Sequence, residues 1–125
     1  MKKVYICSPY RADNSVELDR NIAYAQELTR EAIDAGFAPI TPHLYITQCV
    51  NDNKVQERTA GLAVGLELIK CCDLLIIGSR YGISEGMQAE IAAAGKKKIE
   101  TTELRPMQYA HLEHSLLYRR LYRKN

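Results

Sequence analysis

No stretch of this sequence approaches the roughly 18 apolar residues that a membrane-spanning helix requires. The chain also lacks a large excess of one charge, because its 17 Lys and Arg residues and 15 Asp and Glu residues give a net charge of +2. A balance this small does not indicate a nucleic-acid or membrane partner. The 125 residues, 46% of them hydrophobic and 26% charged, are typical of a globular protein that buries one core without disulfides or metals.

The cysteines show no pattern that binds a metal. The chain has four cysteines, at Cys7, Cys49, Cys71 and Cys72. Their spacing does not match a metal site, and the adjacent Cys71 and Cys72 are poorly placed for a structural disulfide. Buried free thiols are the expected state. His111 and His114 have no acidic or cysteine partner at a suitable spacing, so we expect no metal and no cofactor.

Signals for export or for several domains are also missing. The N-terminus, Met1 to Val4, has no apolar signal core or cleavage site, which makes the cytoplasm the expected compartment. No internal repeat, low-complexity segment or linker divides the chain. These features predict one domain over residues 1–125.

The sequence does contain a regular alternation of short apolar runs and helical patterns. Strands are predicted at Lys3–Cys7, Phe37–Ile40, Leu74–Ile77 and Lys97–Thr101. Helices are predicted at Val16–Ala35, at Glu57–Cys72, from Ser84 onward and at Pro106–Arg123. Strands joined by helices predict an α/β fold: a doubly wound, mostly parallel sheet of four to five strands, flavodoxin-like or Rossmann-like, with an added C-terminal helix within residues 103–125.

Ligands of such sheets bind beyond the carboxyl ends of the strands. Two polar loops, Ser8–Asn14 and Ser79–Ser84, follow such ends. They share one crevice if the first and third strands are neighbours, as they are in the flavodoxin-like order. Thr41–Asn53 is long for a connection in a small α/β domain and is a candidate binding lid.

The stretch from Asp73 to Ala94 is the most informative part of the chain. Its apolar run suits a strand buried on both faces, and Ser84 is a good N-cap for the alanine-rich helix that follows. Gly86 lets a ligand approach the first amides of that helix, which favours an anion site there. Glu90 lies further along the helix, and helical side chains lean back toward the N-terminus, so its carboxylate is directed at the same place.

Three parts of the sequence resemble the nucleoside 2-deoxyribosyltransferase family: Tyr5–Arg11 (YICSPYR), His43 in mid-chain and Ser84–Glu90 (SEGMQAE). The most similar branch is that of the 2'-deoxynucleoside 5'-phosphate N-hydrolases and related uncharacterised small proteins. The likeness extends over roughly residues 3 to 101 in order and spacing.

This resemblance implies a role for each matching residue. Glu90 corresponds to the nucleophile that attacks the anomeric carbon of deoxyribose, and Ser84 and Arg11 correspond to residues that hold the 5'-phosphate. Tyr5 matches a tyrosine of the sugar pocket. Transferases that act on free nucleosides carry an aspartate where this chain has Ser84, so the serine favours a monophosphate substrate. The remaining expected substrate contacts are Ser8, His43 and Gly86.

The chain also departs from the family pattern. The family places an aspartate on the second helix to assist at the sugar or the leaving base, and the matching position here is Gly65, with Glu67 two residues further on. Each expected site residue also has a purely structural explanation, such as solvent exposure for Glu90 and Arg11, capping for Ser84, or packing for Tyr5.

Three functions therefore remain open. The first is hydrolysis or transfer at the N-glycosidic bond of a (deoxy)nucleoside 5'-monophosphate through a glutamate nucleophile. The second is a catalytically diverged module that binds or senses nucleotides on the same fold. The third is cleavage of a nicotinamide dinucleotide. All three have a small-molecule nucleotide as partner and require neither nucleic acid nor membrane.

The predicted terminal helix carries a wide apolar stripe. Its large apolar side chains are Met107, Leu112, Leu116, Leu117, Tyr118 and Leu121. One face of a small domain does not easily cover so many, so we expect a homodimer or higher homo-oligomer with Pro106–Arg123 near the interface. The alternative is that the whole stripe packs on its own sheet.

Overall fold

The computed structural model describes residues 1–104, in which strands and helices alternate as predicted. The elements are β1 (Lys3–Cys7), α1 (Ser15–Asp34), β2 (Ala38–Ile40), the short 3-10 helices η1 (Pro42–Leu44) and η2 (Ile46–Gln48), α2 (Val55–Ile69), β3 (Leu74–Gly78), α3 (Glu85–Lys96) and β4 (Glu100–Leu104). The predicted terminal helix, Pro106–Arg123, lies outside the described residues.

The four described strands form one sheet in the order β2-β1-β3-β4, and every neighbouring pair is parallel. This is the doubly wound, flavodoxin-like arrangement that the sequence predicts. β1 lies directly beside β3, with Val4 paired to Leu74 and Cys7 to Ile77. The loops that follow these two strands therefore leave the sheet at the same edge.

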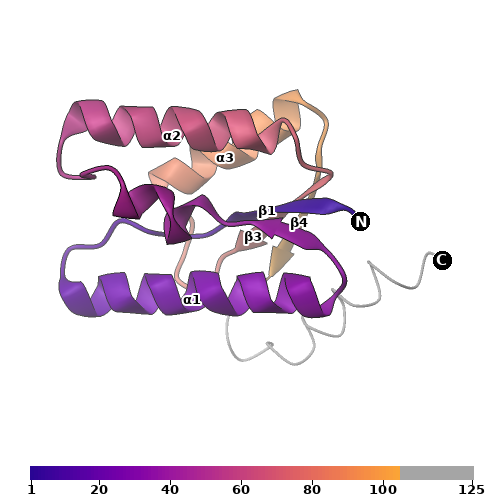
Figure 1. The fold of residues 1–125 in the computed structure, drawn as a ribbon, viewed down its shortest axis with the longest axis horizontal. Coiled ribbons are helices and arrows are strands. Elements are labelled where there is room, and N and C mark those ends of the chain that lie inside the picture. The colour runs from indigo at the N-terminus through magenta and orange to yellow at the C-terminus, as the bar shows by residue number, and fades with distance from the viewer. Residues whose placement is uncertain (105–125) are drawn as a thin grey trace.

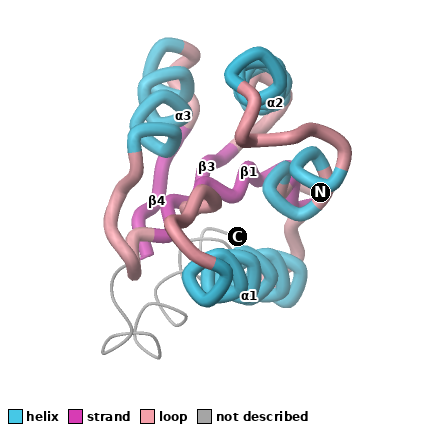
Figure 2. Tube along the Cα trace, turned by 90° about the vertical axis from the view of Figure 1, so that its left-hand side faces the viewer, coloured by secondary structure: helices cyan, strands magenta, loops and turns pink. Residues whose placement is uncertain are grey.

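Helices cover both faces of the sheet. Figure 1 and Figure 2 show α1 on one side of the strands and α2 with α3 on the other. Because side chains alternate along a strand, Val4 and Ile6 pack in the cluster with α1, whereas Tyr5 and Cys7 pack in the cluster with α2 and α3. This alternation directs Tyr5 toward the side of the sheet on which α3 lies.

Local signals explain where α1 begins and ends. Asn14 is its N-cap and accepts a hydrogen bond from the Glu17 amide at 2.9 Å. The chain leaves the helix through Gly36, whose φ of 88° is readily adopted only by glycine. The predicted bounds of this helix are correct to within one residue.

Two other predicted boundaries are wrong. β4 occupies Glu100–Leu104 rather than Lys97–Thr101, because α3 continues to Lys96 and Lys98 then turns the chain with a φ of 56°. Residues 103 and 104 therefore belong to the sheet and not to a terminal helix. α2 spans Val55–Ile69 rather than Glu57–Cys72, so residues 70–73 form the connection to β3. None of the described helices is long and apolar enough to cross a bilayer.

Candidate active site

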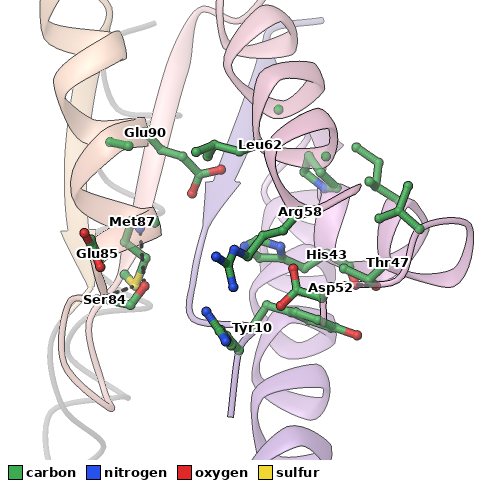
Figure 3. Close-up of a pocket in the computed structure, with 18 of the residues that line it drawn as sticks. Tyr10, His43, Thr47, Asp52, Arg58, Leu62, Ser84, Glu85, Met87 and Glu90 are labelled. Atoms are coloured by element: carbon green, nitrogen blue, oxygen red, sulfur yellow. Dashed lines mark hydrogen bonds between the residues drawn. The ribbon is translucent and has the colours of Figure 1, made fainter. Parts of the chain in front are cut away.

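A cavity of about 490 Å³ opens at the carboxyl ends of β1 and β3. Its walls come from the loop after β1, from the segment 42–52, from α2 and from the first turns of α3 (Figure 3). This volume is typical of small-molecule sites. The two loops predicted to share a crevice do meet here, and the candidate lid Thr41–Asn53 contributes one wall.

Glu90 lies at the inner end of this cavity. It is only 3% exposed, so the explanation as a solvent-facing helix residue is wrong. The Tyr5 hydroxyl donates a hydrogen bond to its Oε2, whereas Oε1 is buried without a partner among the described residues. Burial raises the pKa of Glu90 to about 7, although hydrogen bonds from Tyr5 and Cys7 oppose the shift. The site therefore holds a carboxyl group that titrates near neutrality with one oxygen unpaired.

Gly65 faces this carboxylate from α2. A Cβ atom at this position would lie 2.8 Å from the Tyr5 hydroxyl and 3.6 Å from Glu90 Oε2. The position that corresponds to the family's aspartate thus adjoins Glu90 but carries no acid. Glu67 does not replace it, because its side chain is 72% exposed and pairs with Lys70 on the surface.

Two further side chains at the end of β1, Cys7 and Ser8, differ in their role at the cavity. Ser8 is fully buried, lines the cavity, and its Oγ has no hydrogen-bond partner among the described residues. The Cys7 thiol contacts the Met87 carbonyl at 3.8 Å, and burial together with Glu90 raises the pKa of this thiol. Cys7 is therefore a neutral packing residue, whereas Ser8 Oγ and Glu90 Oε1 are buried polar atoms without a hydrogen-bond partner among the described residues.

The start of α3 forms the outer end of the cavity. Ser84 caps the helix by accepting a hydrogen bond from the Met87 amide at 3.3 Å, which leaves its own hydroxyl proton free to donate. A Cβ atom at Gly86 would meet no atom within 4 Å, so the helix start is open to a ligand. Arg11 is an exposed side chain at the cavity, and Glu85 places a carboxylate in the same first turn.

The loop after β1 and the candidate lid together carry an aromatic pair. The rings of Tyr10 and His43 stack with centroids 5.5 Å apart and an interplanar angle of 23°. Burial lowers the pKa of His43, although a hydrogen bond to the Ser8 backbone and the nearby Asp52 charge oppose the shift. Burial therefore favours the neutral form of the imidazole, which lines the cavity.

Polar side chains of α1 connect the two loops that line the site. Asn21, buried on α1, donates to the Tyr10 carbonyl at 3.1 Å. Arg20 donates to Asn21 Oδ1 at 3.1 Å, and its guanidinium carbon lies 4.0 Å from the centroid of the Tyr81 ring. The loop after β1 and the loop after β3 are thus held by a shared set of contacts.

The structure brings six of the seven expected site residues to one cavity: Ser8, Arg11, His43, Ser84, Gly86 and Glu90. Tyr5 lies behind the wall and reaches the site only through its bond to Glu90. Sequence reasoning missed Tyr10, Asp52 and Arg58. Arg58 lies one turn before Leu62 and two before Gly65, but helical spacing alone does not show that this side of α2 faces a cavity.

The described residues contain no cluster of three His, Cys, Asp or Glu side chains able to hold a metal ion.

Comparison with known proteins places the chain in a family and defines its fold. Residues 2–104 match the family model described as a domain of unknown function, DUF7768, and the chain belongs to that family. No curated protein matches the sequence significantly.

Two enzymes are among the solved structures that share the fold. A 2-deoxyribosyltransferase from Bacillus psychrosaccharolyticus is 22% identical with a TM-score of 0.62, over 83% of this chain and 72% of that protein. A 2-desoxiribosyltransferase from Leishmania mexicana is 16% identical with a TM-score of 0.58, over 84% of this chain and 65% of its own length. The chain thus has a 2-deoxyribosyltransferase-like fold, and it spans slightly less than two thirds of the second enzyme.

Proposed function

We propose that the protein cleaves or transfers the N-glycosidic bond of a 2'-deoxynucleoside 5'-monophosphate, with Glu90 as the nucleophile. The observation that carries this proposal is the buried Glu90 carboxylate at the inner end of the cavity, of which one oxygen, Oε1, has no hydrogen-bond partner among the described residues. The names of the two enzymes that share the fold support the same class of reaction.

The positions of Glu90 and Ser84 fit the two ends of a sugar phosphate. They are six residues apart, which along an α-helix corresponds to about 9 Å. A phosphate at the helix start would receive the Ser84 hydroxyl, the open amides near Gly86 and the planar donor group of Arg11. The sugar would then lie between the phosphate and Glu90, beside the unpaired Ser8 Oγ.

The chemistry follows from this placement. As the bond between the anomeric carbon and the base breaks, positive charge grows on the sugar, and the Glu90 carboxylate stabilises it and forms an ester. The electron pair of the broken bond leaves with the base. Water or a second base then displaces Glu90 and restores the carboxylate. Contacts to the remote phosphate hold the anomeric carbon in position for attack.

The test is incubation with deoxynucleoside and ribonucleoside 5'-monophosphates and the corresponding nucleosides, followed by chromatography of the released base. We expect release from deoxynucleotides, at least about tenfold preferred over nucleosides because charge-assisted phosphate contacts are lost in the latter. Arg11→Ala should remove most of this preference, whereas Arg30→Ala, a surface arginine paired with Asp34 on α1, should not.

Glu90→Gln should slow base release by roughly three or more powers of ten, and the surface variant Glu67→Gln should have no effect. Equal rates for wild type and Glu90→Gln would refute the proposal.

A nucleotide-binding module without catalysis is the second candidate, and the observation that favours it is the absence of an acid at Gly65. Tight binding of monophosphates without base release in the same experiment would support this candidate instead.

A further inference from the structure

The loop of residues 79–84 joins β3 to α3 and therefore determines where Ser84 lies at the start of α3. Its first residue is fixed to the sheet, because the Ser79 amide donates to the carbonyl at the end of β4 at 3.1 Å. Its last three residues are exposed. The position of Ser84 therefore depends on how the two residues in the middle of the loop, Arg80 and Tyr81, are anchored.

Arg80 attaches this loop to α1. Its guanidinium forms an ion pair with Glu27 at 2.6 Å, and its side chain is only 11% exposed. The guanidinium carbon also lies 4.5 Å from the centroid of the Tyr24 ring, and the Arg80 amide donates to the Tyr24 hydroxyl at 3.3 Å. Arg80 is not among the residues that line the cavity. It therefore anchors the loop and does not serve as a ligand group.

Tyr81 is held by a second arginine of α1. The guanidinium carbon of Arg20 lies over the Tyr81 ring, 4.0 Å from its centroid. Arg20 also donates to Asn21 Oδ1, and Asn21 donates to the Tyr10 carbonyl, both at 3.1 Å. Arg11 follows Tyr10 directly in the chain. These contacts form a continuous path from the loop that carries Arg11 to the loop that leads into α3.

The two loops carry the groups that the proposed function assigns to the phosphate, Arg11 and Ser84. Charge-assisted hydrogen bonds require distances of about 2.7–2.9 Å, so a shift of about 1 Å in either loop would break one of them. We infer that Arg20 and Tyr81 are positioning residues, whose contact sets the spacing of the two phosphate-binding groups and thereby the affinity for the 5'-phosphate. This inference rests on the proposed function.

The experiment measures kcat/KM for the four common 2'-deoxynucleoside 5'-monophosphates and for their nucleosides. Arg20→Ala and Tyr81→Leu should each lower kcat/KM for the monophosphates by at least about threefold and leave the values for the nucleosides unchanged. The double variant should lose no more than the weaker single variant, because both changes remove the same contact. Tyr81→Phe keeps the aromatic ring and should retain most of the preference for monophosphates. Arg30→Ala, on the same helix but paired with Asp34, is the control and should match the wild type.

A preference for monophosphates that is the same in the wild type, Arg20→Ala and Tyr81→Leu would overturn the inference and leave the proposed function intact. Equal losses on monophosphates and nucleosides would also overturn it, because the contact would then serve only the fold. A loss in Arg20→Ala without one in Tyr81→Leu would do the same, since Arg20 would then bind the phosphate itself.

Calorimetric titration with the same compounds separates the two proposals if no base is released. Weaker binding of monophosphates to both variants, with binding of nucleosides unchanged, would support the positioning role and refute the proposed function. Identical binding by the wild type and the variants, again without base release, would refute both.

Discussion

Glu90 combines two properties that a helix residue seldom has together, because it is an ionisable group and is almost completely buried. The Tyr5 hydroxyl donates a hydrogen bond to its Oε2, and its Oε1 is unpaired in the described part of the chain. A carboxylate in this state costs folding free energy, so a function in the cavity explains its presence better than stability does.

The pH dependence of catalysis follows from the pKa of Glu90, which burial raises to about 7. A nucleophile must be deprotonated, so kcat/KM should rise with pH up to about 7 and then level off. The second ionisation of the substrate phosphate lies near pH 6, so the profile should be repeated with the nucleoside, which lacks this group. A kcat/KM that instead falls as the pH rises through 7 would assign Glu90 the role of an acid.

The stability of the protein should depend on the same group. Burial raises the pKa of Glu90 from 4.5 to about 7, so across this window the folded protein retains a proton that the unfolded chain releases. The free energy of unfolding therefore falls between these pH values and stays lower above them. In urea unfolding, Glu90→Gln should be more stable than the wild type by up to about 3 kcal/mol at pH 8 and by little below pH 4.5. A difference independent of pH would contradict this account.

At the scale of elements, the site depends on close contact between α2, β1 and α3. Gly65 allows the α2 backbone to approach the Tyr5 hydroxyl, which in turn holds Glu90 of α3. On the opposite face of the sheet, polar contacts of α1 hold the loop after β1 and the loop after β3. The sheet thus sets where the elements lie, and a few contacts between elements set where the carboxylate points.

Gly65→Ala tests this contact. The added Cβ atom would lie 2.8 Å from the Tyr5 hydroxyl, so we expect a loss of about 1–3 kcal/mol despite the higher helix propensity of alanine. Tyr5→Phe removes the obstructing oxygen and should reduce this loss by at least about 0.5 kcal/mol in the double variant. Gly95→Ala in α3 is the control, because its Cβ would meet no neighbour and should stabilise the helix. Additive losses for Gly65→Ala and Tyr5→Phe would contradict the proposed contact.

Element boundaries were predictable where the sequence carries a local signal. The apolar run of β3 and the N-cap residues of α1 and α3 are such signals, and the predicted positions of these three elements are confirmed. β4 has no such signal, because Glu100–Leu104 lies at the edge of the described sheet and consists mostly of polar, exposed residues, and its predicted position is wrong by three residues.

At the scale of the whole molecule, the order of strands and helices was enough to predict the parallel sheet and the edge at which the cavity opens. That edge explains why residues as distant in sequence as Ser8 and Ser84 were expected at one site. Arg58 and Asp52 could not be predicted, because their place depends on how α2 and the lid segment pack across the crevice. Patterns within single elements do not encode such contacts.

The prediction of a homo-oligomer also belongs to this scale, and it falls on residues outside the described part of the chain. Light scattering of the intact protein at micromolar concentration should give a dimer or a pair of dimers. Leu117→Glu and Leu121→Glu should dissociate it, because each places a charge in the predicted apolar stripe. A monodisperse particle of 14.2 kDa would rule out the oligomer.

The central claim is that Glu90 attacks the anomeric carbon, and trapping the ester tests it most directly. A 2'-fluoroarabinosyl nucleotide, whose fluorine slows release of the sugar from the enzyme, should add one sugar phosphate to the protein mass. Peptide mapping should place this adduct on Glu90, and Glu90→Gln should gain none. An adduct on any other residue, or equal labelling of Glu90→Gln, would contradict the claim.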